Sequence, residues 1–221
     1  MYLRYKQAVE KDLPPGPIVE LGSGKGHAQQ TIPHLITSEY TQETHVNLVM
    51  DGRHLPFADE SLSGLLMLNV FHHIPNVDLF LSEAQRCLKP GGMVFIIDQH
   101  PGLFSYYIYR FLHNEDFTHH SPEWAFQATG PFSANGALAW MVFNRDREKF
   151  HQMYTQLSLA QYLPHTPLLY WLSGGLKRWT LLPGKTHKLA TLADKILMRL
   201  STNLGSFVDI KIIKNSEEIK C

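Results

Sequence analysis

The stretch VELGSGKG at residues 19–26 decides the fold class of this chain. The segment IVEL at 18–21 has the length and apolar character of a short buried strand, and three glycines follow at alternate positions. A glycine-rich turn lets the backbone approach a ligand closely, and a helix N-terminus behind it offers unpaired N–H groups. In an open parallel sheet, ligands bind at the carboxyl ends of the strands, where this turn lies. The stretch therefore predicts an α/β domain with a nucleotide-like ligand at its first turn.

The glycine spacing bears on which ligand the turn serves. A dinucleotide fingerprint has the spacing G-x-G-x-x-G, whereas this chain has glycine at position 26 and His27 where the third glycine would stand. A lone glycine-rich turn with no ligand at all is about as common as a binding site. The glycines alone therefore do not identify the ligand. Its identification depends on the acidic residues and motifs further along the chain.

Short apolar runs alternate with helix-like segments through much of the chain, which is typical of a mostly parallel sheet. We expect helices at about 27–32, 78–88 and 188–200, and we expect the last strand, which is amphipathic, to lie at a sheet edge. The length and apolar content favour a single domain over residues 1–221, with the aromatic-rich segment 101–149 as an inserted lid. The further strands are predicted at 35–40, 46–50, 65–68, 93–97, 157–162 and 207–213.

Charge and composition exclude some classes of protein. The formal net charge is zero, which argues against a basic surface built for nucleic acid. The two cysteines lack a paired spacing and are interpreted as free thiols in a reducing compartment. We find no signal-type N-terminus and no apolar run long enough to span a bilayer. These features predict a cytoplasmic protein and leave peripheral contact with a membrane open.

Acidic residues stand near the ends of the second and third predicted strands. Glu39 is placed where a carboxylate accepts hydrogen bonds from ribose hydroxyls, although an ordinary exposed carboxylate would look the same. Asp51 is placed to accept a hydrogen bond from an adenine amino group, or else it initiates a turn before Gly52.

Four segments taken in order resemble the class I S-adenosylmethionine-dependent methyltransferases. They are VELGSGKG at 19–26, DGRHLPFADESL at 51–62, NVFHHIP at 69–75 and EAQRCLKPGGMVFIID at 83–98. The closest similarity is to the small-molecule branch that includes quinone-biosynthesis methyltransferases. The resemblance implies S-adenosylmethionine as cofactor and a Rossmann-like α/β fold: a seven-stranded, mostly parallel sheet, helices on both faces, and the last strand antiparallel.

The resemblance also implies roles for individual residues. Glu20 and Asn69 match positions beside the methionine part of the cofactor, the glycine loop lies beneath it, and Asp51 contacts adenine. One departure is that few residues separate this loop from Asp51, so the second strand and its following helix are abbreviated. The predicted cofactor-binding residues are Glu20, Gly22, Ser23, Gly24, Gly26, Glu39, Asp51, Gly52 and Asn69.

Methyl transfer needs an activated methyl group, which the cofactor supplies, and positioning, which the protein supplies. His72 and His73 begin the helix after the fourth predicted strand and are the candidates for catalysis, against the alternative of hydrogen-bonded structural histidines. Neighbours in sequence rarely share one metal face, and the segment 113–116 (HNED) has no matching second element. The sequence therefore predicts no metal site.

The function predicted from these features is methyl transfer to a small, apolar or aromatic acceptor. The alternative is a catalytically inactive S-adenosylmethionine-binding protein with a regulatory or partner role. A nucleotide-dependent oxidoreductase is disfavoured by the missing third glycine and the LPF turn at 55–57, and a nucleic-acid methyltransferase by NVFH at 69–72 in place of N-P-P-Y. The acceptor, the methylated atom and the oligomeric state are left open.

Overall fold

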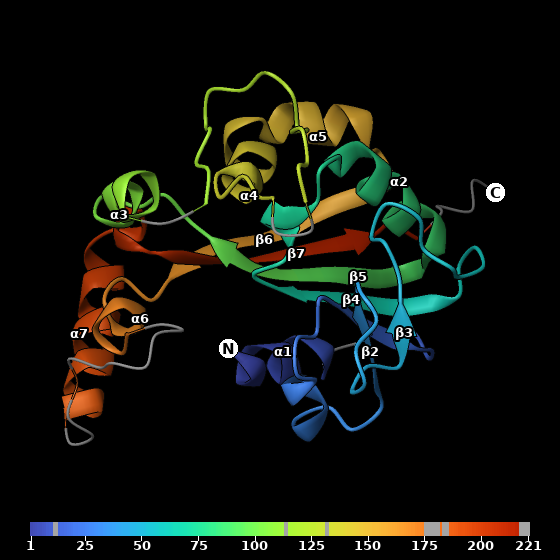
Figure 1. The fold of residues 1–221 in the computed structure, drawn as a ribbon, viewed down its shortest axis with the longest axis horizontal. Coiled ribbons are helices and arrows are strands. Elements are labelled where there is room, and N and C mark those ends of the chain that lie inside the picture. Colours follow the sequence, from blue (N-terminus) through green and yellow to red (C-terminus); the bar gives the residue numbers. More distant parts are fainter. Residues whose placement is uncertain (11–12, 113–114, 131–132, 175–181, 183–185, 217–221) are drawn as a thin grey trace.

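The computed structural model describes residues 1–10, 13–112, 115–130, 133–174, 182 and 186–216. Within this part of the chain, the strands form a seven-stranded sheet in the order β3-β2-β1-β4-β5-β7-β6 (Figure 1). The strands are β1 (Ile18–Leu21), β2 (Leu35–Glu39), β3 (Leu48–Val49), β4 (Leu62–Leu68), β5 (Leu88–Gln99), β6 (Leu157–His165) and β7 (Phe207–Lys214).

The strand directions confirm the predicted fold class. β1, β2, β3, β4 and β5 pair in parallel, and β7 runs antiparallel to both of its neighbours, β5 and β6. The carboxyl ends of the parallel strands therefore meet at one edge of the sheet, which is where an open α/β sheet binds its ligands.

The prediction that the last strand lies at a sheet edge is wrong. β7 is inserted between β5 and β6, and β6 forms the edge. The amphipathic pattern of β7 has another cause, because two of its charged side chains, Asp209 and Lys214, are paired with residues of other elements. Asp209 forms ion pairs with Arg4 and His165, and the Lys214 ammonium lies 2.9 Å from the Glu60 carboxylate.

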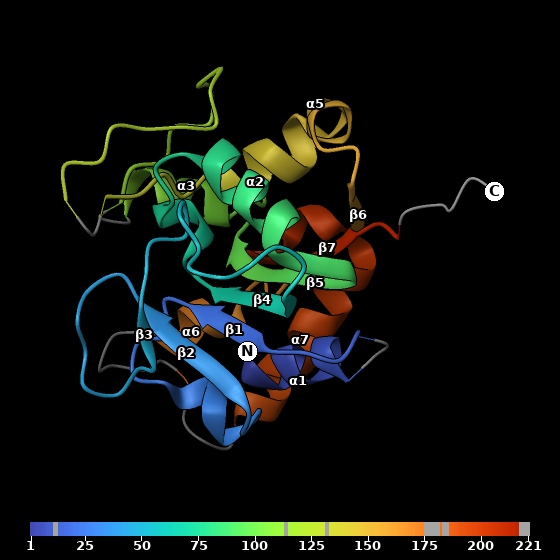
Figure 2. The same ribbon diagram turned by 90° about the vertical axis from the view of Figure 1, so that its right-hand side faces the viewer.

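Helices cover both faces of the sheet (Figures 1 and 2). Tyr5 of α1 packs on one face against a core that includes Leu66 and Phe95. On the opposite face, Phe80 and the rest of the apolar side of α2 are buried in the main core. The α-helices are α1 (Tyr2–Val9), α2 (Val77–Cys87), α3 (Ser105–Phe111), α4 (Leu138–Trp140), α5 (Arg147–Met153), α6 (Leu169–Leu172) and α7 (His187–Leu200).

The first half of the domain is abbreviated, as the sequence predicted. The helix expected at 27–32 is a short 3₁₀ turn, η1 (His27–Gln30), and turns at 40–47 connect β2 directly to β3. Other short helical turns are η2 (Phe71–His73), the π-helical η3 (Met141–Arg145) and η5 (Thr202–Leu204).

Part of the aromatic-rich segment between β5 and β6 forms a small core of its own, whereas Trp124 and Phe143 of the same segment belong to the main core. Tyr109 and Phe117 are buried in the small core with Met141, and Trp171 of α6 packs against this cluster. The role of 101–149 as a lid stays a prediction. α3, α6 and α7 lie at one end of the molecule (Figure 1). In the described part of the chain, we find no helix with the length and apolar character needed to cross a membrane.

Candidate active site

The glycine loop after β1 has a backbone that side chains disfavour. Gly22, Gly24 and Gly26 have φ angles of 63°, 54° and 68°, in the left-handed region. A Cβ built on Gly22 would lie 2.4 Å from a methyl carbon of Val70. The alternation of glycines is therefore required by the path of the chain as it leaves β1.

Ser23 fixes this loop to the sheet. Its hydroxyl donates to the Glu20 carbonyl at 3.2 Å and accepts from the Ser38 amide at 3.0 Å. Ser23 is 5% exposed, so its role here is to hold the loop on β2. Glu39, at the end of β2, accepts a hydrogen bond from the Gly24 amide at 2.5 Å.

A cavity of about 250 Å³ opens at the carboxyl ends of the first strands. Its lining includes Gly22 from the glycine loop, Glu39 from β2, and Asp51 with Gly52 after β3. His73 lines the same cavity. The structure thus brings together four of the predicted cofactor-binding residues and one of the two histidines. Lining residues that the sequence analysis did not single out are Leu21, Tyr40, Met50, Arg53, Val70, Ile74, Pro75, Ala128 and Gly130.

Asp51 has an immediate partner that the sequence analysis missed. The Arg53 guanidinium contacts both carboxylate oxygens of Asp51, with the closest nitrogen at 2.6 Å, and the Arg53 amide donates to the same carboxylate at 2.9 Å. Partial burial raises the pKa of Asp51, but the hydrogen bonds from Arg53 outweigh this and hold it below its usual value. The sequence Asp51-Gly52-Arg53 could have predicted this pair, because it places a cation two positions from the carboxylate. The carboxylate is thus kept ionised in the cavity wall.

Glu20 and Asn69 lie at the carboxyl ends of β1 and β4 but do not line this cavity. Within the described residues, Oε2 of Glu20 and Oδ1 of Asn69 are buried acceptors with no hydrogen-bond partner. Burial raises the pKa of Glu20 to about 7. Asn69 also has a φ of 55°, which is uncommon for a residue other than glycine. Buried acceptors without donors fit a ligand that brings a donor, such as the ammonium group of a methionine moiety.

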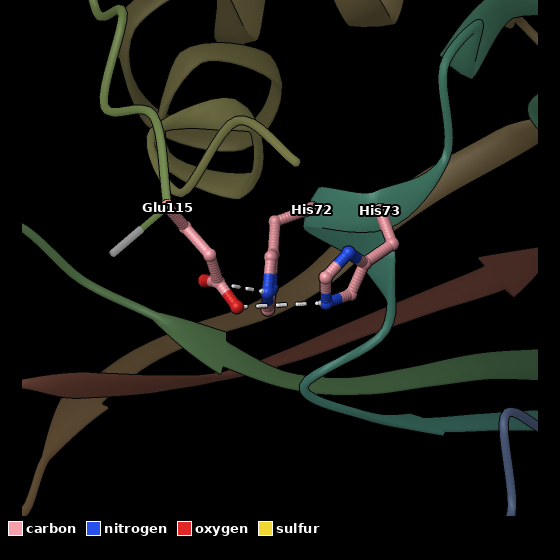
Figure 3. A group of neighbouring side chains, drawn as sticks. All are labelled: His72, His73 and Glu115. Atoms are coloured by element: carbon pink, nitrogen blue, oxygen red, sulfur yellow. Dashed lines mark ion pairs between the residues drawn. The ribbon is translucent and has the colours of Figure 1, made fainter. Parts of the chain in front are cut away.

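The two histidines differ in their surroundings. His72 is 2% exposed, and its Nδ1 lies 2.6 Å from a carboxylate oxygen of Asp98 at the end of β5. Its Nε2 lies 3.4 Å from Glu115, which comes from the segment after α3 (Figure 3). Burial alone would lower the pKa of His72, but the Asp98 and Glu115 carboxylates raise it to about 10.

His73 lies beside His72, with the ring centroids 4.2 Å apart. Its Nδ1 contacts the backbone oxygen of Ser133 at 3.1 Å, and its Nε2 lies 3.8 Å from Glu115 (Figure 3). Burial and the neighbouring His72 lower the pKa of His73. The structure therefore joins His72, His73, Asp98 and Glu115 in one cluster at the cavity wall. The sequence did not predict the contact between Glu115 and the histidine pair, because these residues lie far apart in the chain.

The fold and this site together define a class I methyltransferase-like protein: an α/β sheet with an antiparallel β7, a glycine loop after β1, and acids at the ends of β2 and β3. Comparisons with known proteins agree. Residues 19–96 match the family model described as a methyltransferase domain. The part of the chain from β1 to β5 is thus similar to a methyltransferase domain.

A demethylmenaquinone methyltransferase from Tropheryma whipplei (strain Twist) is 39% identical over 57 residues, 25% of this chain and 24% of that protein. A phthiotriol/phenolphthiotriol dimycocerosates methyltransferase from Mycobacterium ulcerans is 39% identical over 51 residues, 23% of this chain and 19% of that protein. This chain thus spans about a quarter or less of the length of these curated relatives.

A solved structure from Thermotoga maritima, described as a methyltransferase and possible histamine N-methyltransferase, superposes with a TM-score of 0.56. The match covers 97% of this chain and 89% of that one at 20% sequence identity. This similarity extends over the whole domain and concerns the fold.

Proposed function

We propose that this chain transfers a methyl group from S-adenosylmethionine to a small, apolar acceptor. The observation that carries the proposal is the cavity at the strand ends, where Gly22, Glu39, Asp51 and Gly52 meet His73. Residues with cofactor roles in the resemblance thus share one wall with a candidate catalytic side chain. When bound, S-adenosylmethionine supplies the activated methyl group.

Different residues of the chain would bind different parts of S-adenosylmethionine. Asp51, held ionised by Arg53, would accept from the adenine amino group, and Glu39 would accept from the ribose. The unpartnered buried oxygens of Glu20 and Asn69 would receive the methionine ammonium. An orphaned acceptor costs free energy in the empty fold, and a cationic donor removes that cost.

The two histidines have different parts in this proposal. His73 lines the cavity and is the residue that would contact the acceptor. His72 is buried behind it, between Asp98 and Glu115, and would act as a positioning residue. Of the predicted catalytic pair, His73 would thus contact the acceptor and His72 would position His73.

An apolar acceptor is supported by the surface at one end of the molecule. α3 exposes Tyr107 and Phe111, and α7 exposes Leu189 and Leu200, each at more than half of its surface. A contiguous exposed apolar patch is typical of a binding surface, and these four side chains are candidates for such a patch. The names of the two curated relatives, a demethylmenaquinone and a phthiotriol/phenolphthiotriol dimycocerosates methyltransferase, denote quinone and lipid substrates for those proteins.

Turnover tests the proposal. The chain is incubated with S-adenosylmethionine carrying a radiolabelled methyl group and with quinone-like, phenolic and fatty-acid acceptors. We expect label to move to at least one of these acceptors, and His73→Ala to slow its transfer by about 100-fold, the lower range of a lost acid–base or positioning contact. His120→Ala, on the second adjacent histidine pair and outside the cavity lining, is the control and should react like the wild type. Tight cofactor binding with no transfer to any acceptor would contradict the proposal and favour the inactive alternative.

A further inference from the structure

The tautomers of His72 and His73 are fixed by their neighbours. The Nδ1 of His73 faces the backbone carbonyl of Ser133, and the Nδ1 of His72 faces the Asp98 carboxylate. Both partners are acceptors, so each Nδ1 carries the proton in the neutral ring. The Nε2 atom of each ring faces the Glu115 carboxylate (Figure 3). Neutral His73 has a lone pair on this nitrogen, whereas the raised pKa of His72 keeps a proton on its Nε2, and a metal ion would bind there in exchange for that proton.

The ligand atoms of these three residues have the spacing of a metal-binding set. His72 Nε2 and His73 Nε2 lie 3.4 Å and 3.8 Å from the two Glu115 oxygens, and all three residues offer ligand atoms within 4.8 Å of one another. Nitrogen and oxygen ligands about 2.0–2.2 Å from a tetrahedral ion are roughly 3.4 Å apart. Small side-chain movements would bring the set to that geometry.

We propose that His72, His73 and Glu115 bind one divalent transition-metal ion of the zinc class. Two imidazole nitrogens and one carboxylate are a zinc-type ligand set, whereas magnesium prefers oxygen ligands only. The Asp98 carboxylate on His72 Nδ1 provides the outer contact that typically orients a metal-binding histidine. The Gln99 side-chain amide donates to Glu115 at 3.1 Å and orients the third ligand.

The fold explains why the sequence predicted no metal site. Adjacent histidines seldom share a metal because their side chains usually diverge. Here the 3₁₀ turn η2 holds the two rings 4.2 Å apart, and Glu115 approaches them from a segment more than forty positions along the chain. The segment 113–116 thus has a partner after all, because Glu115 meets the histidine pair His72–His73.

The location gives the ion a function. His73 lines the cofactor cavity, and Glu115 lines a second cavity of about 340 Å³ with Thr118, Gln127 and Asn135. The ion would lie between the two cavities with a coordination position left for an acceptor oxygen. A bound cation lowers the pKa of such an oxygen and makes it a better nucleophile. This role depends on the proposed methyl transfer, whereas metal binding itself does not.

Metal titration of the full chain tests the site. Chelator-treated protein is titrated with Zn²⁺ by calorimetry, and with Co²⁺ to record the absorption spectrum of the bound ion. We expect one ion per chain, and a loss of affinity of at least about 100-fold in His73→Ala and Glu115→Gln. Asp98→Asn, which changes only the outer contact, should weaken binding by about 10–100-fold.

The adjacent pair His119–His120 provides the matched control. Its ring centroids lie 3.6 Å apart, and it is not part of the metal-binding set found among the described residues. His120→Ala should therefore bind Zn²⁺ as tightly as the wild type. Circular dichroism of each variant checks that it is folded, and we expect Glu115→Gln to fold because the Glu115 side chain is partly exposed.

The outcomes separate this site from the proposed function. Failure of the folded wild type to bind Zn²⁺ or Co²⁺ would overturn the metal site, as would equal affinity in His73→Ala and Glu115→Gln. S-adenosylhomocysteine is titrated into the same metal-free samples. If S-adenosylhomocysteine binds but no metal ion does, only the metal-site proposal is wrong. If a metal ion binds but S-adenosylhomocysteine does not, only the methyltransferase proposal is wrong.

Discussion

Replacing Gly22 with alanine is expected to weaken binding of S-adenosylhomocysteine by at least about 100-fold, which corresponds to about 2.7 kcal/mol. The backbone at Gly22 has a φ of 63°, and the new Cβ would lie 2.4 Å from a methyl carbon of Val70. Both residues line the cavity at the strand ends. The Val70 side chain must therefore move within the cavity wall, which changes the shape of the site. Calorimetric titration measures the affinity.

Gly91 is the matched control for the backbone strain. Its φ is 79°, but a Cβ there would come no closer than 3.9 Å to any atom, and Gly91 is not in the cavity lining. Gly91→Ala should lose about 1–2 kcal/mol of stability through its left-handed backbone while keeping full affinity. The double variant Gly22→Ala/Val70→Ala removes the clash and should regain part of the binding. Unchanged affinity in folded Gly22→Ala would show that the ligand lies elsewhere.

Replacing Asp98 with alanine is expected to lower the free energy of unfolding by about 3–5 kcal/mol. Asp98 is fully buried and accepts hydrogen bonds from the His72 ring, the His72 amide and the Gln99 amide. Its removal leaves a buried imidazole and two buried amides without their acceptor. Urea unfolding at neutral pH in the presence of a chelator measures the loss without a contribution from a bound ion.

Asp98→Asn separates the charge from the hydrogen bonds. The amide oxygen still accepts from His72, so we expect this variant to lose clearly less stability than Asp98→Ala. A change within about 0.5 kcal/mol for Asp98→Ala, the range of ordinary surface substitutions, would contradict the account of the buried cluster.

Local pattern predicted most of the sheet. Apolar runs placed the central parallel strands β1, β4 and β5, because a parallel strand covered on both faces is apolar along most of its length. The pattern was wrong where it had to choose a neighbour. β7 looks amphipathic, but the charges on Asp209 and Lys214 are paired with residues far away in the sequence. The hydropathy of one segment does not predict which distant residues its charged side chains will contact.

The candidate site divides in the same way. The glycine loop and Asp51 belong to short motifs, so the sequence predicted them and the structure places Gly22 and Asp51 in one cavity wall. Arg53 was missed although it stands two positions from Asp51, because only the folded turn shows the guanidinium returning to the carboxylate. Glu115 was missed as a partner of His72 because the contact joins two distant segments.

The central claim is that the cavity at the strand ends binds the cofactor of a methyltransferase. Calorimetric titration of the wild-type chain with S-adenosylhomocysteine, beside Asp51→Ala, tests it most directly. We expect one site per chain with a Kd of roughly micromolar strength, about −8 kcal/mol, and a strong loss of affinity in the variant. No heat of binding from folded wild-type protein, or equal affinity in both proteins, would contradict it.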